Sequence, residues 1–218
     1  MWFSKLMKYL CILTVIQLFT ACATTQAPDY LKRGNDYYKR HDYVSAINEY
    51  NKAMARKPNY ADAYLNRGNA FAGKRSVDNS INDCNKAIEL NPKYAAAYYN
   101  RGIAYAEKKS YDKAISDYDK AIELNPKYVA AFLNRGVVHA EKRSYDKALN
   151  DYAKVIELYP RLAIAYFNKA VTCEKAGYIE KAVNSYKSFI RYAATNQDGS
   201  RIRYAQDKIL MLEGRRRL

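Results

Sequence analysis

Asparagine recurs at a fixed interval in this chain, and its side-chain amide can both donate and accept hydrogen bonds. Four of them stand 34 positions apart: Asn66, Asn100, Asn134 and Asn168. A column of such amides can bind the backbone of an extended partner chain, whatever side chains that partner carries. The alternative is structural, because polar side chains in the middle of a helix can bond to a neighbouring repeat or to water instead. The sequence leaves both interpretations open.

Side chains that commonly perform acid–base or covalent chemistry are few. The body of the chain has two histidines, His41 and His139, and two cysteines, Cys84 and Cys173, which lie 89 residues apart. Neither histidine has an evident nucleophile or carboxylate partner, and no glycine-rich phosphate loop is present. The sequence therefore predicts a protein that is not an enzyme and uses no metal, cofactor or small-molecule substrate.

The asparagines belong to a longer repeat. Arg-Gly pairs follow the same step of 34 residues and begin at Arg33, Arg67, Arg101 and Arg135. A period of this length is the signature of stacked supersecondary units. Glycine and proline number only 8 and 5 in 218 residues and stand at regular spacings, which favours helices joined by short turns. The predicted fold class is all-α.

Each unit has the pattern of a helical hairpin. Aromatic residues lie four positions before the glycine and, in most units, three after it, so they share one helical face. A second stripe places a small residue four positions before a tyrosine, as at Ala114 and Tyr118. The glycine lets that second helix approach closely. Caps and ends of the second helices are expected at Ser76, Ser110 and Ser144 and at Pro58, Pro92, Pro126 and Pro160.

With its aromatic, glycine, alanine and proline slots at a period of 34, the chain resembles the tetratricopeptide repeat. The resemblance covers five units: 27–60, 61–94, 95–128, 129–162 and 163–196. It implies a right-handed superhelical solenoid of stacked antiparallel helical hairpins, whose first helices line a concave groove for peptides or partner helices. A capping helix is predicted at 199–214, with Ile202, Ala205, Ile209 and Leu212 on one side, and a basic tail at 215–218.

The resemblance also implies which side chains line the groove. They are Asn66, Asn69, Tyr99, Asn100, Ile103, Leu133, Asn134, Val137, Phe167 and Asn168, with Leu65 and Val171 in the same slots. Amides are expected to bind the partner's backbone, and apolar side chains to add affinity. The family's carboxylate clamp needs lysine or arginine on this face, and apolar residues stand there instead, so we do not expect a clamp.

The first residues have the order of an export signal. Lysines precede an uncharged run from Tyr9 to Phe19, and small residues surround Cys22. The run is too short to span a membrane comfortably. The stretch LFTAC, ending at Cys22, resembles the lipobox of bacterial lipoproteins. It implies a signal peptide at 1–22, a lipidated Cys22, a linker at 23–29 and sorting to the outer membrane. Cleavage after Ala23 is the alternative, and it would release a soluble protein.

The net charge of +15 favours anionic partners. Lysine and arginine cluster at 39–40, 74–75, 108–109 and 142–143, forming either a basic ridge or a solvated edge. Tyrosines can stack on bases, but here most fall in packing slots. The sequence predicts a non-enzymatic scaffold of the bacterial envelope that binds a protein or peptide, either anchored in the outer membrane facing the periplasm or free in the periplasm. A cytosolic adaptor and a nucleic-acid-associated repeat protein are the alternatives.

Overall fold

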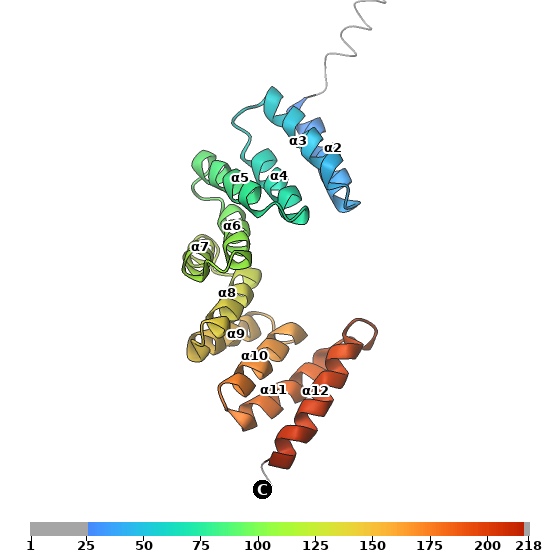
Figure 1. Cartoon of the computed structure of the whole chain (residues 1–218), viewed down its shortest axis with the longest axis vertical. Coiled ribbons are helices and arrows are strands. Elements are labelled where there is room, and N and C mark those ends of the chain that lie inside the picture. Colours follow the sequence, from blue (N-terminus) through green and yellow to red (C-terminus); the bar gives the residue numbers. More distant parts are fainter. Residues whose placement is uncertain (1–25, 216–218) are drawn as a thin grey trace, which may run out of the picture. The chain divides into compact units, whose positions relative to one another are not determined.

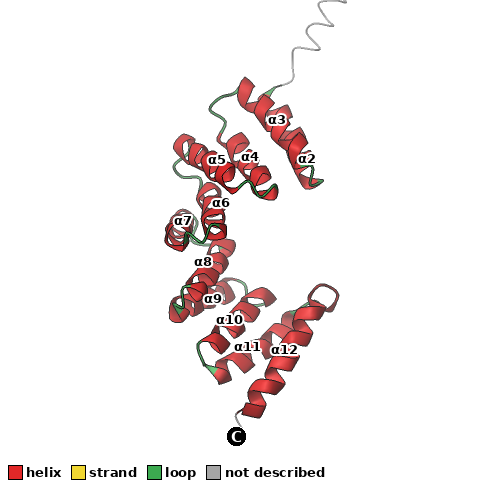
Figure 2. Ribbon diagram, viewed as in Figure 1, coloured by secondary structure: helices red, strands yellow, loops and turns green. Residues whose placement is uncertain are grey.

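The structure is a computed structural model that describes residues 26–215, and of 195–197 and 215 only the backbone. This part of the chain consists of helices joined by short loops and contains no strand, as Figure 2 shows, so the predicted all-α class is confirmed. The helices (Figure 1) are α2 Ala27–Lys39, α3 Tyr43–Arg56, α4 Ala61–Gly73, α5 Val77–Leu90, α6 Ala95–Glu107, α7 Tyr111–Leu124, α8 Val129–Glu141, α9 Tyr145–Leu158, α10 Ala163–Lys175, α11 Ile179–Tyr192 and α12 Thr195–Arg215. The predicted signal peptide, Cys22 and the basic tail after Arg215 lie outside the described residues.

The helices form two compact units that divide after Leu90. The N-terminal unit contains the hairpins α2–α3 and α4–α5, and the C-terminal unit contains α6–α7, α8–α9 and α10–α11 followed by α12. Within the N-terminal unit α3 packs on α4, and within the C-terminal unit α7 packs on α8, α9 on α10 and α11 on α12. Each unit is therefore a stack of helical hairpins.

The ends of the helices follow from local chemistry. In four hairpins the second helix ends two residues before a proline, at Arg56, Leu90, Leu124 and Leu158. Proline has no backbone N–H, and the residue before it disfavours the helical conformation, so the helix stops there as predicted. Inside each hairpin the chain turns through one residue with positive φ, always in the same slot: His41, Arg75, Lys109, Arg143 and Gly177.

The predicted serine caps are wrong in their chemistry. Ser110 and Ser144 stand at the N-cap positions of α7 and α9, but neither hydroxyl accepts a hydrogen bond from the helix backbone. Ser76 Oγ accepts from the side chain of Asn79 at 2.9 Å. Both serines have φ near −80° and ψ near 63°, outside the usual extended N-cap geometry. The residue type therefore predicts the position of the cap, but the backbone conformation prevents the hydrogen bond. Asp42, at the start of α3, does accept such a bond, from the backbone N–H of Ser45.

In the hairpins α2–α3, α6–α7 and α8–α9 a tyrosine of the second helix packs against a glycine of the first. A Cβ atom added at Gly102 would lie 2.7 Å from the ring of Tyr118, and one added at Gly136 would lie 2.6 Å from Tyr152. These tyrosines are almost fully buried, beside alanines with no exposed surface. The glycine therefore sets the distance between the helices of a hairpin, as its slot in the sequence predicts.

The array ends in α12, which packs on α11. Ala205 and Leu212 are fully buried in a cluster with Tyr186 and Phe189, and Ile202 and Ile209 pack against it. This confirms the apolar face predicted for the capping helix, although the helix begins earlier than expected, at Thr195. Ion pairs from Lys208 to Glu174 and from Lys187 to Glu213 hold α12 to the last hairpin.

Candidate functional site

The predicted groove residues are distributed over both units, and each is at least partly exposed. Asn66 and Asn69 lie on α4 of the N-terminal unit; α6, α8 and α10 of the C-terminal unit hold Tyr99, Asn100, Ile103, Leu133, Asn134, Val137, Phe167 and Asn168. Leu65 is different, with only 4% of its surface exposed. Because α4 packs against α2, α3 and α5 together, the position of Leu65 on α4 faces the interior of the unit. Leu65 is therefore a core residue, and its expected place in the groove was wrong.

In the N-terminal unit a hollow of about 350 Å³ lies over α2, α3 and α4. Its lining residues are Asn35, Tyr38, Lys39, Tyr50, Asn66 and Asn69. The Oδ1 atom of Asn35 accepts two hydrogen bonds of 2.9 Å, one from the Tyr50 hydroxyl and one from the Asn66 amide. Burial raises the pKa of Tyr50, so its hydroxyl stays protonated and donates. The network fixes the amide nitrogen of Asn35 and the carbonyl oxygen of Asn66, a donor and an acceptor with the complementarity of a peptide group.

In the C-terminal unit a hollow of about 130 Å³ lies over α8, α9 and α10. It is mostly apolar, with Val137, Phe167 and Val171 among its walls and Asn168 as an amide. Its charged members, Glu141 and Lys175, form an ion pair of 3.1 Å between the two hairpins. The volume is close to that of engineered cavities, ~150 Å³, that hold one benzene molecule, so one apolar side chain fits.

A cluster of tyrosines lies beside this surface and uses one of the predicted amides. Asn134 donates from Nδ2 to the hydroxyl of Tyr99 at 3.1 Å, and the Tyr99 ring packs against Tyr128 in a tilted arrangement with centroids 4.9 Å apart. Burial raises the pKa of Tyr99, and the bond from Asn134 opposes this. The amides of Asn66 and Asn134 thus each bond to a neighbouring hairpin, which is the structural interpretation that the sequence left open, and each keeps a carbonyl oxygen.

Paired charges between the two helices of the first four hairpins were missed from the sequence. Arg67, Arg101 and Arg135 each bind one carboxylate with two nitrogens, as in Arg67 to Asp83 at 2.8 and 2.7 Å. Their partners lie 16 residues later, at Asp83, Asp117 and Asp151, and are buried. In the first hairpin Arg33 pairs with Glu49. The signal was present as an acidic residue at that fixed offset, and the last hairpin, with Lys169 and Ser185, lacks it.

Asn35, Tyr38 and Lys39 were also missed as lining residues of the N-terminal hollow. Lys32, not asparagine, occupies the column's slot in the first unit, so the asparagine column does not point to α2. The signal was Asn35 itself, which stands 34 positions before the predicted Asn69.

The basic turns lie where the sequence predicts, between the two helices of a hairpin, and they are exposed. Acidic residues accompany them: Lys142 pairs with Asp112 of the preceding hairpin, and Lys175 with Glu141. In the C-terminal unit these turns therefore carry mixed charge, as a solvated edge does.

The histidine and the cysteines of the repeats are packing residues. His139 is half-buried on α8, and desolvation lowers its pKa, so it is neutral at pH 7. Cys84 and Cys173 are fully buried free thiols, and burial raises the pKa of Cys173, which disfavours the reactive thiolate. Among residues 26–215 no group of three or more metal-ligating side chains gathers, and no helix is long and apolar enough to cross a membrane.

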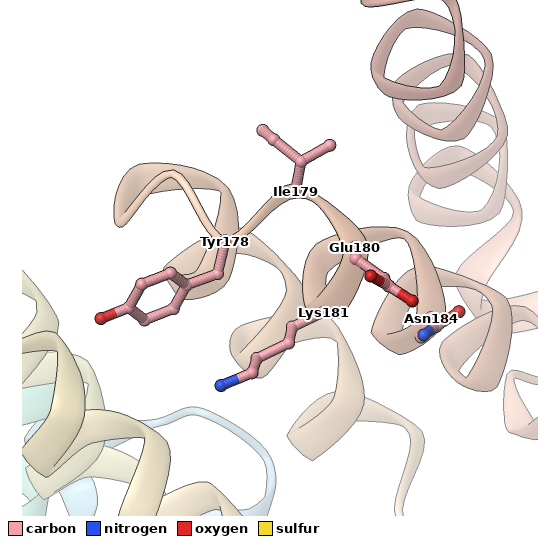
Figure 3. A pocket seen from close by; sticks show the side chains of 5 residues that line it. All are labelled: Tyr178, Ile179, Glu180, Lys181 and Asn184. Carbon is pink, nitrogen blue, oxygen red and sulfur yellow. The ribbon is translucent and has the colours of Figure 1, made fainter. Parts of the chain in front are cut away.

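A third hollow, of about 440 Å³, lies at the start of α11 and is shown in Figure 3. In this view Tyr178 and Lys181 point to the same side, while Ile179 points away from them. Lys181 Nζ lies 5.1 Å from the centre of the Tyr178 ring, so the cation is already engaged. The residues that line the hollow all come from one short stretch of the chain, Tyr178 to Lys181 and Asn184. They do not bring polar groups from different helices together, so this hollow is not a candidate site.

Stacked helical hairpins with hollows on the face of their first helices define a repeat scaffold. Profiles of the tetratricopeptide repeat match residues 61–94, 95–128 and 133–199, and a further profile of the same repeat matches 34–74. The chain belongs to the tetratricopeptide-repeat family. This fold is that of a scaffold for protein–protein interactions, and its members are typically not catalytic. A comparison with curated proteins gives no match.

Solved structures share the fold. MamA is 25% identical with a TM-score of 0.68, over 80% of this chain and 94% of MamA. The first repeat domain of Spaghetti (RPAP3), solved with the HSP90 peptide SRMEEVD, is 28% identical with a TM-score of 0.53, over 55% of this chain and 95% of that domain. PilF of Pseudomonas aeruginosa has a TM-score of 0.72 at 19% identity, over 85% of this chain and 88% of PilF, and shows the fold alone.

Proposed function

We propose that the chain is a non-enzymatic adaptor that captures a segment of a partner protein on the face of its first helices. The observation that carries this proposal is that residues predicted from the sequence to line the groove also line hollows in the structure. Two hollows, one in each unit, are lined by residues selected from the sequence, among them Asn66 and Asn69 in one and Val137, Phe167 and Asn168 in the other. The peptide held by the related Spaghetti domain supports the same mode of binding for this chain.

The cellular place in this proposal is the bacterial envelope. The order of the first residues and the LFTAC stretch support export and a lipid anchor at Cys22. In this proposal the repeats face the periplasm and serve in the assembly of an envelope complex. Fractionation of wild type and Cys22→Ala, with the intact mass of the N-terminus, tests it. Triacylated Cys22 in the outer-membrane fraction, lost in the variant, is expected. A soluble protein beginning at Thr24 would remove the anchor, and an uncleaved cytosolic chain would overturn the envelope assignment.

Photocrosslinking in cells tests the capture surface. A photoreactive phenylalanine analogue replaces Asn69 or Val137 in the two hollows, and Asn48 or Ser116 on exposed second-helix surfaces as matched controls. Adducts from the hollow positions that are missing at the controls are expected. Identical adducts at all four positions, or none at any, would contradict capture on the first-helix face.

A further inference from the structure

The hairpin α2–α3 differs from the later hairpins on the side where those hairpins meet the one before. Two positions of the first helix, seven residues apart, are buried there in α4, α8 and α10: Ala63 and Ala70, Ala131 and Val138, Ala165 and Thr172. Val138, for example, packs with Ala114 and Tyr118 of the preceding hairpin. In α2 the same positions hold Asp29 and Asp36, which are exposed. This side of α2 therefore presents charge to solvent and is not built to receive another hairpin.

Arg33, the repeated arginine of this hairpin, has donors that its counterparts have used. The arginines of α4 and α8 bind an aspartate with two nitrogens and also donate from Nη1 to the preceding hairpin, as Arg67 does to Asn51 at 2.6 Å. Arg33 approaches Glu49 through Nε, at 2.8 Å, and its Nη1 and Nη2 groups donate to no residue of the described chain. Its side chain is 49% exposed, against 23% for Arg67. Arg33 thus keeps the outer half of its guanidinium for a ligand.

Arg33 lines a hollow of about 180 Å³ on α2, together with Asp36, Tyr37 and Arg40. Residues 33, 37 and 40 are spaced by four and three positions, so they lie on one face of the helix. The flat guanidinium of Arg33 is held against the Tyr30 ring, with Cζ 4.6 Å from the ring centre. Because one water occupies about 30 Å³, the hollow has room for a small oxyanion.

The charges of the hairpin favour an anion in this hollow. Residues 27–56 contain six lysines and arginines against four aspartates and glutamates. Each carboxylate already has a partner: Asp29 the backbone N–H of Gln26, Asp36 the ammonium of Lys39, Asp42 the backbone N–H of Ser45, and Glu49 both Arg33 and Lys52. Arg40 has no ion-pair partner within the described residues. Asp36 is the one carboxylate in the wall, and it opposes an anion there.

The arrangement of donors distinguishes between kinds of anion. A carboxylate has two oxygens in one plane, and a single arginine satisfies both, as Arg67 does for Asp83. Two guanidiniums and a phenol hydroxyl around one hollow supply more donors, from more directions, than a carboxylate can accept. A phosphate group has acceptor oxygens on several sides and matches the arginine fork, so it uses this set fully.

We propose that the hollow formed by Arg33, Tyr37 and Arg40 binds a phosphate group, carried either by a soluble phosphate or by the headgroup of a lipid. Both sources present the same oxygens to the two guanidiniums. The hollow shares no residue with the one that contains Asn35 and Asn66. The proposal is therefore independent of partner capture, and either can fail without the other.

Titration of the purified full chain, followed by amide chemical shifts in NMR, tests the site. The probes are inorganic phosphate and glycerophosphoglycerol, the soluble diester headgroup of phosphatidylglycerol, at constant ionic strength. We expect saturable shifts in α2. Arg33→Gln and Arg40→Gln should each weaken binding ~10-fold or more, because each removes charge-assisted hydrogen bonds. The matched control, Arg56→Gln, removes an exposed arginine at the end of α3 and should change the affinity less than ~2-fold.

Two further variants separate a phosphate site from a general effect of charge. Arg33→Lys keeps the charge but loses the planar fork, so it should still weaken binding. Asp36→Asn should strengthen binding ~2-fold or more, because it removes the carboxylate in the wall. Since Arg33→Gln also breaks the pair with Glu49, thermal unfolding accompanies every variant. Arg40→Gln removes no ion pair of the described chain and decides the test if the Arg33 variants are unstable.

The outcomes also identify the source of the phosphate. Tighter binding of the diester assigns the site to a lipid headgroup, and tighter binding of inorganic phosphate assigns it to a soluble phosphate. No saturable shift in α2 with either probe would overturn the proposal. Acetate that binds as tightly as both probes, or equal weakening by Arg56→Gln and Arg40→Gln, would overturn it as well, because charge alone would then explain the response.

Discussion

The effects of removing Arg135 and Asp151 on the free energy of unfolding should be strongly coupled, because the two side chains form a buried ion pair. Removing Arg135 should cost more than removing Asp151. Arg135 donates from Nε and Nη2 to the two oxygens of Asp151 at 3.0 and 2.6 Å. The Asp151 side chain is 6% exposed and that of Arg135 is 20% exposed. Arg135 also binds Asp119 of the preceding hairpin at 2.5 Å, so the arginine has a second partner. Within the described residues, Arg135 is the ion-pair partner of Asp151.

These contacts set the expected magnitudes. Removing one partner of a buried ion pair costs about 3–5 kcal/mol, because the other charge stays buried. Arg135→Met should cost ~3 kcal/mol, since Asp151 then has neither solvent nor a cation. Asp151→Ser should cost only ~1–2 kcal/mol, because the guanidinium keeps Asp119 and some water. The double variant, which removes both charges, should cost ~2 kcal/mol, so the coupling energy is about 2 kcal/mol.

Urea unfolding of the four proteins, followed by circular dichroism, measures this cycle. Lys154→Met is the matched control, because its pair with Glu157 is exposed, and such pairs contribute ~0.5 kcal/mol or less. A coupling energy below ~0.5 kcal/mol, or an Arg135→Met variant no less stable than the control, would refute the reasoning that the pair is buried and cooperative.

Three further variants test single features of the hairpins by thermal unfolding. Gly102→Ala should destabilise by ~1 kcal/mol, because its Cβ would lie 2.7 Å from Tyr118 and overpacking outweighs the better helix propensity. Gly68→Ala should destabilise less, because its nearest neighbour atom lies 3.2 Å from the added Cβ. Lys109→Gly should stabilise by ~0.5 kcal/mol, since φ is +57° and glycine relieves that strain; a loss would contradict it. His139→Tyr should flatten the fall of stability below pH 6.5: the lowered pKa of His139 means that the unfolded chain binds the proton first, so stability is lost as pH falls, by at most ~1.4 kcal/mol per pH unit.

Much of this fold was contained in the sequence because the repeat is built from local rules. The period of 34 residues, the proline after four of the five second helices and the glycine opposite a tyrosine in three hairpins all depend on spacing within one hairpin. Helical periodicity converts such spacing into a face, so the all-α class and the apolar side of α12 could be predicted without coordinates. The serine caps failed because a cap depends on backbone angles that residue type alone does not specify.

The sequence by itself determined the repeats, their helices and the list of residues that can face a ligand. The tertiary structure alone decided how those side chains are used: Asn66 bonds to Asn35, Asn134 bonds to Tyr99, and Leu65 is enclosed. It also joined Val137 and Phe167, on different hairpins, in one hollow. The physical reason is that helical spacing fixes a side chain's direction on its own helix, whereas its hydrogen bonds and burial depend on the neighbouring hairpin, which no local pattern describes.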